Sequence, residues 1–104
     1  VLGDMLEIAD QVIEGHRKVG NRVADIASFL VTRGRLASVI AREAIDCGMP
    51  RDAVYCASDN QDVIGKLREV VRPKDLVLVC GSGPLHLKEV VDSLVDTTAP
   101  TCEV

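Results

Sequence analysis

A glycine-rich turn, Gly81-Ser82-Gly83-Pro84, contains residue types that could take part in chemistry. Its two glycines can adopt a positive φ, and its proline is suited to the first position of a helix. The free N–H groups of a helix that starts here, together with the Ser82 hydroxyl, could hold a phosphate or a carboxylate. The turn matches neither GxGxxG nor GxxxxGK[ST], so a plain tight turn is the competing interpretation.

Two carboxylates and a histidine near the start of the chain form a second candidate group. Asp4 and Glu7 lie just after a short apolar stretch, where a carboxylate could hold an ammonium group, although surface carboxylates are common in such loops. His16 is four residues after Val12 and three before Val19, so helical spacing directs it along the buried side of a helix. A histidine there is more often a core or partner-facing residue than a catalyst.

The remaining candidates have simpler explanations. His86 opposes the dipole of a helix that starts near it, so we expect it to be exposed. Cys80, at a strand end, is expected to be a buried, inert thiol. No set of nucleophile, base and orienting residue can be assembled, so the residues alone indicate a binding module and no complete catalyst. We interpret the following basic residues as solvated charges: Arg17, Lys18, Arg22, Arg33, Arg35 and Arg42.

Composition limits the classes of function. The net charge of −4 has the wrong sign for nucleic-acid binding, and Phe29 and Tyr55 are the only aromatic residues that could stack on bases. No apolar run approaches the roughly 20 residues of a membrane helix. The four cysteines are widely separated without a CxxC pair, which predicts reduced thiols and no zinc site in a cytoplasmic protein.

Helical and extended segments alternate along the 104 residues, which predicts one α/β domain with a three-layer α/β/α, Rossmann-like, open and mainly parallel sheet. Asp10 is expected to cap the first helix, and Ser58 and Gln61 to form a capping box before the third. The chain begins as if inside a strand, so we expect it to be a fragment of a longer protein. The expected strands are residues 1–4, 28–32, 53–57 and 75–80, and the expected helices are 10–26, 36–47, one with apolar positions at 63–71 and one with apolar positions at 87–94.

The run Leu76–Val79 does not alternate with polar residues, which predicts a central strand covered on both faces. Ligands of such sheets bind at the carboxyl ends of strands, near the point where strand order reverses. If the first and fourth strands are neighbours, the loops 3–7 and 81–84 lie side by side and form one candidate site.

The stretches VLGDMLEIAD and DLVLVCGSGPLHLKEVVDSL, together with His16, Val19 and Gly20, resemble the C-terminal domain of the Mur ligases. That family typically shows LGDMLELG, then H..VG, then D.VLVKGSR and LE.VV..L. The resemblance covers essentially the whole chain in the same order and spacing. It points to the branch that adds D-alanyl-D-alanine to UDP-N-acetylmuramoyl-tripeptide.

The resemblance implies a cytoplasmic enzyme of peptidoglycan synthesis, with roles in cell-wall biogenesis, cell shape and cell division. Such enzymes have an N-terminal domain for the UDP-sugar, a central P-loop domain for ATP and Mg²⁺, and a third domain that closes over the central one and helps bind the incoming amino acid or dipeptide. The tripeptide carboxylate is phosphorylated, and the dipeptide amine attacks the acyl phosphate. Residues 1–104 would be the closing domain, inactive alone, without nucleic-acid or membrane partners.

The resemblance implies no catalytic residue in this domain, but it implies a substrate-binding role for Asp4, Met5, Glu7, His16, Gly81, Ser82 and Gly83. This chain departs from the family at Cys80, where the family has lysine, at Gly83, where it has arginine, and at Ala9, where it has glycine. Loss of two cations weakens a carboxylate or phosphate contact at the second loop, unless a neighbouring basic residue compensates. A diverged module that binds a small ligand or a partner without ligase activity therefore stays an alternative. A receiver domain fits less well, because Cys80 lies where its lysine would be.

Overall fold

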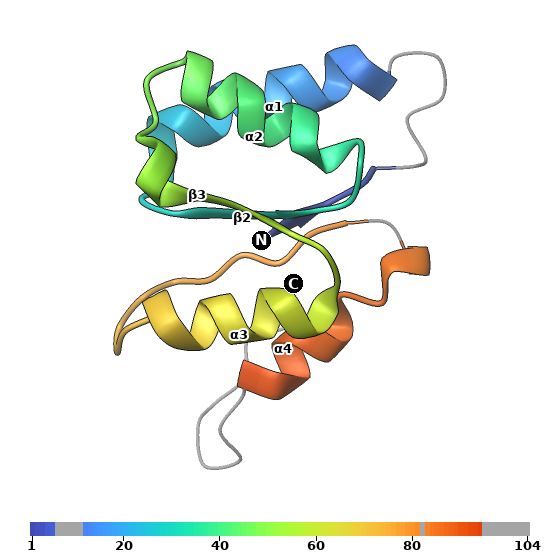
Figure 1. Ribbon diagram of the computed structural model, residues 1–104, viewed down its shortest axis with the longest axis vertical. Helices are drawn as coiled ribbons and strands as arrows, with labels where there is room; N and C mark the ends of the chain where they lie inside the picture. Colours follow the sequence, from blue (N-terminus) through green and yellow to red (C-terminus); the bar gives the residue numbers. More distant parts are fainter. Residues whose placement is uncertain (6–11, 82, 95–104) are drawn as a thin grey trace.

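The computed structural model describes residues 1–5, 12–81 and 83–94, and a parallel three-stranded sheet lies at its centre (Figure 1). The strands are β1 (Leu2–Gly3), β2 (Leu30–Arg33) and β3 (Val54–Ala57), in the order β1-β2-β3. Leu2 pairs with Thr32 across the first ladder, and Leu30 pairs with Val54 across the second. The strands expected at 28–32 and 53–57 are therefore confirmed to within two residues at each end.

A fourth segment, residues 78–80, lies beside β1 on the edge opposite β2. Cys80 forms a parallel bridge with Leu2, and its carbonyl oxygen accepts a 2.8 Å hydrogen bond from Gly3 N–H. Cys80 N–H donates to Val1 O at 3.0 Å, and the Val1 nitrogen donates to Leu78 O at 2.7 Å. The first and fourth extended segments are therefore neighbours, as the sequence predicted.

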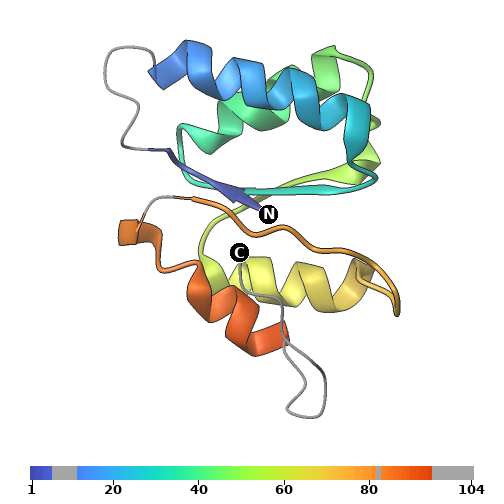
Figure 2. The same ribbon diagram turned by 180° about the vertical axis from the view of Figure 1, so that it is seen from behind.

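Helices cover both faces of this sheet, which confirms the three-layer α/β/α class. Helices α1 (Val12–Ile26) and α2 (Ala37–Asp46) lie on one face, and α3 (Asn60–Val70) and α4 (Lys88–Leu94) on the other (Figures 1 and 2). Successive side chains of β2 point to opposite faces of the sheet. Leu30 packs in the core between the sheet and helices α1 and α2, and Val31 packs in the core between the sheet and helices α3 and α4. None of the described helices is long and apolar enough to cross a membrane.

Gly20 lets α1 and α2 approach each other closely. A Cβ at this position would lie 2.6 Å from the Ile40 carbonyl oxygen and 2.8 Å from Glu43 Cβ. Any larger residue would push the two helices apart, because both neighbours belong to the body of α2. The glycine of the H..VG pattern is therefore explained by helix packing.

The predicted capping box of α3 is wrong by one residue. Asp59, not Ser58, is the N-cap, and its Oδ1 accepts a 2.7 Å hydrogen bond from Asp62 N–H. Asp62 takes the place expected of Gln61, and its Oδ2 accepts from Ser58 N–H at 2.9 Å. Ionised carboxylates at both positions also interact favourably with the helix dipole, which a hydroxyl and an amide do not. Asp10, the expected cap of α1, lies outside the described residues.

The prediction of a central strand at 75–80 is also wrong. Within 75–80 only Cys80 forms a β-bridge, while Leu76 is 97% exposed and Leu78 is 57% exposed. Val79 packs against the core over α3 and α4, so the segment is covered on one face only. The described part of the chain places no element outside this segment, and the apolar run therefore forms an edge.

Candidate functional site

The loops that follow β1 and the 78–80 segment meet at the carboxyl ends of the strands. A Cβ on Gly81 would lie 3.1 Å from Gly3 Cα and 2.5 Å from Leu87 Cδ1. A Cβ on Gly3 would lie 2.5 Å from Leu85 Cδ1. The two loops therefore lie side by side, as expected, and glycine is needed at both positions because the backbones and the leucines fill the space.

The second loop differs from the expected strand-to-helix turn. Gly83 begins a single 3-10 turn, Gly83–Leu85, and α4 starts only at Lys88. Because α4 does not follow the Gly81 turn directly, its start argues against the anion cradle, one of the two interpretations of this turn. The positive φ falls at His86 (52°) and not at Gly81, so Gly81 is required for close approach and not for backbone freedom.

Asp4 connects the first loop to the start of α2. Its Oδ1 accepts a 2.6 Å hydrogen bond from Ala37 N–H, and the N-cap residue of that helix, Leu36, provides no side-chain cap. Gly34 has a φ of 113°, and the Asp4 carboxylate lies where a Cβ of residue 34 would be. Asp4 therefore caps a helix that begins 33 residues later, a role that local sequence patterns could not reveal.

His16 lies beneath the same loop. It is 0% exposed, which confirms that it faces the buried side of α1, and its Nε2 accepts a 3.0 Å hydrogen bond from Met5 N–H. Because Nε2 is the acceptor, we infer that a neutral imidazole carries its proton on Nδ1. With no exposed surface in this structure, His16 acts on a substrate indirectly, through residues that it supports such as Met5.

The structure thus separates the predicted site residues into three groups. Asp4, Met5, Gly81 and Gly83 lie at the carboxyl edge of the sheet, with both glycines exposed. His16 supports this edge from below. Glu7 and Ser82 lie outside the described residues.

At this edge, Arg33 was misinterpreted from the sequence and Asn60 was missed. Arg33 is not a free solvated charge: it is half-buried, and its Nη1 donates to Leu85 O at 2.9 Å. Asn60 is 8% exposed, and its Nδ2 also donates to Leu85 O, at 3.0 Å. Their positions in the sequence could have revealed them. Arg33 is the last residue of β2, and Asn60 is the first residue of α3, after the loop that follows β3.

Arg33 and Asn60 lie on the wall of a cleft of about 340 Å³ between the ends of β2 and β3 and the turn before α4. His86, exposed as expected, also lines it, and the His86 carbonyl accepts from Asn60 Nδ2 at 3.2 Å. A larger hollow of about 610 Å³ is lined by residues of α1 and by Glu43 of α2, whereas the smaller cleft lies at the ends of β2 and β3. We therefore take the smaller cleft as part of the candidate site.

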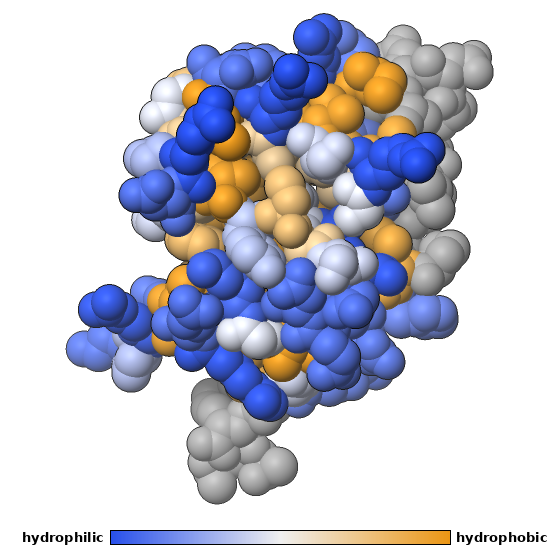
Figure 3. Space-filling view, viewed as in Figure 1, coloured by the Kyte–Doolittle hydropathy of each residue, from blue (hydrophilic) through white to orange (hydrophobic). Residues whose placement is uncertain are grey.

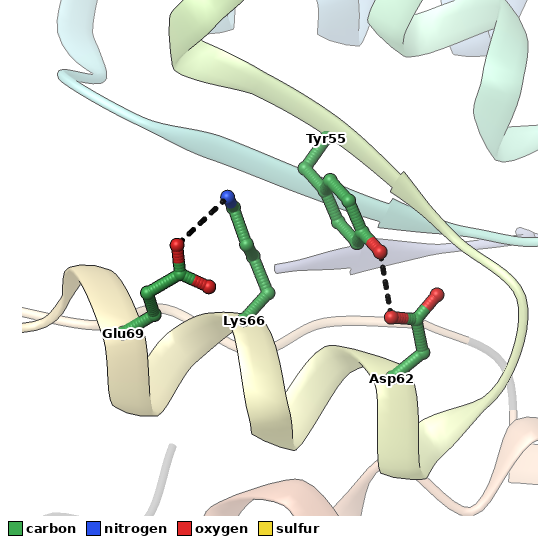
Figure 4. A network of polar contacts seen from close by, with 4 residues as sticks. All are labelled: Tyr55, Asp62, Lys66 and Glu69. Carbon is green, nitrogen blue, oxygen red and sulfur yellow. Dashed lines mark hydrogen bonds and ion pairs between the residues drawn. The ribbon is translucent and has the colours of Figure 1, made fainter.

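A polar network holds the start of α3, which carries Asn60, against β3 (Figure 4). Tyr55 Oη donates to Asp62 Oδ1 at 2.6 Å. This bond, followed by the bond from Ser58 N–H, lowers the pKa of Asp62, and the same contact with Asp62 raises the pKa of Tyr55. Lys66 Nζ lies 5.0 Å from the centre of the Tyr55 ring and 3.7 Å from Glu69 Oε1. In the space-filling view, hydrophilic side chains dominate the surface over α3 (Figure 3).

The described cysteines do not form a catalytic or metal-binding group at this edge of the sheet. Cys47, Cys56 and Cys80 are free and exposed, so the expectation of a buried Cys80 is wrong. Its exposure follows from the edge position of the 78–80 segment. Within residues 1–5, 12–81 and 83–94, no group of three or more histidine, cysteine or acidic side chains could hold a metal ion.

Comparison with known proteins decides the family. Residues 1–83 match the model of the Mur ligase, glutamate ligase domain. The chain belongs to the Mur ligase family. A comparison of this Mur ligase domain with solved structures gave no significant match.

The Mur ligase domain is also similar to curated proteins named UDP-N-acetylmuramoyl-tripeptide--D-alanyl-D-alanine ligase. The Bacillus subtilis (strain 168) protein is 30% identical over 98 residues, which cover 93% of this chain and 21% of that protein. The proteins of Mycobacterium bovis and Mycobacterium tuberculosis (strain H37Rv) are each 32% identical over 110 residues, covering 91% of this chain and 21% of theirs. The Mur ligase domain therefore spans about a fifth of the length of these relatives.

Proposed function

We propose that residues 1–104 form the third, closing domain of an ATP-dependent ligase that adds D-alanyl-D-alanine to UDP-N-acetylmuramoyl-tripeptide in the cytoplasm. The family match and the names of the relatives support this proposal. The structural observation that carries it is the close approach of Gly3 and Gly81, which joins the two family-like loops into one rim at the carboxyl edge of the sheet.

The rim is built to keep its shape when another domain meets it. Asp4 binds the first loop to α2, and His16 binds it to α1. In the proposed reaction the dipeptide amine attacks the phosphorylated carboxyl group of the tripeptide; a C–N bond forms, the C–O bond to phosphate breaks, and inorganic phosphate leaves. A rigid closing domain would help by orienting the amine and by excluding water from the hydrolysable acyl phosphate.

We assign ATP and Mg²⁺ to the central domain of the proposed longer protein, and the UDP-sugar to its N-terminal domain. Within the described residues, no group of three or more carboxylate, histidine or cysteine side chains could hold a metal ion. We assign binding, orientation and closure to this chain.

The proposal is tested on the full-length protein. We expect release of one phosphate per ligation only when ATP, UDP-N-acetylmuramoyl-tripeptide and D-alanyl-D-alanine are all present, with the pentapeptide product identified by its mass. The coding sequence that precedes Val1 should encode roughly 300 further residues, including a P-loop that ends in Lys-Thr or Lys-Ser. Phosphate release that does not depend on the dipeptide, or no product of the expected mass, would contradict the proposal.

A second candidate is a binding module without ligase activity. The observation that favours it is the uncharged second loop, where Cys80 and Gly83 replace the lysine and arginine typical of the family. The same assay separates the two candidates, because a binding module would bind a small ligand, as measured by calorimetry, without releasing phosphate.

A further inference from the structure

We propose that the cleft at the ends of β2 and β3 binds the free carboxylate of a small amino acid or dipeptide, and that the Arg33 guanidinium is the group that binds it. This inference rests on the proposed function, because it names the residue through which the closing domain would hold its amine-bearing substrate. Among the described residues that the family resemblance marks for substrate binding, none lines this cleft.

Arg33 has the position and the fixed geometry that such a contact needs. It is the last residue of β2, at the carboxyl edge of the sheet. Among the described residues that line the cleft, it is the only lysine or arginine. Its bond to Leu85 O uses Nη1, and a guanidinium carries five N–H donors in a planar fork. One anchored donor holds the group in place while others remain for a carboxylate, which the fork matches in shape.

Asn60 lies beside Arg33 in the cleft, because both side chains donate to the Leu85 carbonyl oxygen. Its Nδ2 is within hydrogen-bonding distance of Leu85 O, His86 O and Glu89 Oε2, at 3.0, 3.2 and 2.9 Å. Its Oδ1 is buried and has no hydrogen-bond partner among the described residues. The contacts of Nδ2 hold the Asn60 side chain and the turn before α4 in place at the cleft.

The charges of the cleft indicate the class of ligand. Asp59 and Glu89 lie on the wall with Arg33, so two carboxylates accompany one guanidinium. The Asp59 Oδ1 accepts from Asp62 N–H, and Glu89 Oε2 accepts from Asn60 Nδ2. A multiply charged anion such as phosphate is disfavoured there, whereas a zwitterion offers a carboxylate to Arg33 and an ammonium group to the acids. The volume of about 340 Å³ falls within the usual range for small-ligand sites.

The contact between Arg33 and Leu85 also compensates for the loss of positive charge in the second loop. Gly83 and Cys80 provide no cation, yet the loop ends at Leu85, whose carbonyl is bound to Arg33. The guanidinium therefore lies directly against the loop that lacks a cation of its own. Arg33 thus supplies the basic residue that the departures at Cys80 and Gly83 require.

The test uses the full-length protein and two substrates, D-alanyl-D-alanine and its C-terminal amide. In the wild type we expect the amide to have a KM about 10- to 100-fold higher, because a charge-assisted hydrogen bond is lost. We expect Arg33→Gln to raise the KM for the dipeptide by a similar factor, to leave the KM values for ATP and the UDP-tripeptide unchanged, and to abolish the difference between dipeptide and amide. Arg33→Lys should recover part of that difference.

Arg35→Gln is the matched control, since Arg35 is exposed, two residues away and absent from the cleft wall. It should retain the wild-type preference for the dipeptide over the amide. If Arg33→Gln ligates the dipeptide and keeps the full wild-type preference for it over the amide, this inference is overturned while the proposed function stands. Equal KM values for dipeptide and amide in the wild type would overturn it without any variant, even if Arg33→Gln failed to fold. If the wild type ligates no amino acid or dipeptide, the proposed function fails and this inference fails with it.

Discussion

Met5 N–H donates a 3.0 Å hydrogen bond to Nε2 of the fully buried His16. The bond ties the loop after β1 to the first half of α1 and fixes the tautomer of the imidazole. It turns a histidine that family resemblance assigns to substrate binding into a residue that positions the loop backbone. A consequence is that changes at His16 should act on stability and on the loop together.

We expect His16→Ala to lower the free energy of unfolding by about 2–4 kcal/mol, because it leaves a cavity and removes the acceptor of a part-buried N–H. Urea unfolding of the protein, with His16→Gln as a variant that keeps a polar acceptor and most of the volume, measures this change. A loss below about 0.5 kcal/mol for His16→Ala would show that the hydrogen bond and the packing of His16 contribute little.

Substitution by alanine should destabilise the protein at Gly81 and leave its stability almost unchanged at Gly83. Gly81→Ala would place a Cβ 2.5 Å from Leu87 Cδ1 and 3.1 Å from Gly3 Cα, so we expect destabilisation of about 1–3 kcal/mol by overpacking. Gly83→Ala meets no atom within 4 Å and should change stability by less than about 0.5 kcal/mol. Thermal unfolding of the two variants tests this contrast, and equal effects would refute the close approach of the two loops.

The Tyr55–Asp62 hydrogen bond should make stability depend on pH in the acid range. The bond from the Tyr55 hydroxyl lowers the pKa of Asp62 below its ordinary value of 3.8. The folded state therefore gains stability from this group above pH 3.8, and the gain is lost as the pH falls through the lower, folded-state pKa. Stability curves from pH 2 to 6 should show wild type and Tyr55→Phe converging at the acid end. A difference between them that is constant with pH would contradict this account.

The apolar composition of residues 76–79 predicts that they are buried. Their position at the edge of the sheet predicts instead that they tolerate polar substitutions. Leu76 is 97% exposed, so Leu76→Lys should change the stability of residues 1–104 by less than about 0.5 kcal/mol. Leu87→Ala, at a site only 7% exposed, should cost about 2–5 kcal/mol and is the matched control for a buried leucine. Denaturant unfolding of the two variants measures both values. A large loss for Leu76→Lys would mean that another part of the chain covers this edge.

Local patterns predicted the elements of this fold well, because periodic apolar residues mark the faces that helices and strands bury. These patterns predicted β2, β3 and the four helices. The strand order that is usual in open α/β sheets predicted that the 78–80 segment lies beside β1. The run at 76–79 misled because its composition does not reveal whether a covering element follows. A central strand and an edge strand with the same residues look identical in sequence.

The site was harder to predict because its residues act across long sequence separations. Asp4 caps a helix that starts at Ala37, and Arg33 binds the carbonyl of Leu85, 52 residues later. Neither contact leaves a motif, because both depend on which strand ends meet at one edge. His16 was the exception, since its helical spacing already indicated a buried position.

The Leu85 carbonyl oxygen accepts hydrogen bonds from both Arg33 and Asn60, so three separate connections of the sheet converge on one atom. This convergence limits how the length of the loop can vary. Inserting or deleting one residue between Gly81 and Leu85 would shift that oxygen by about 3 Å, beyond the reach of both donors. Loop-length variants that retain the fold should therefore be found in the connection at 71–75 long before they are found here.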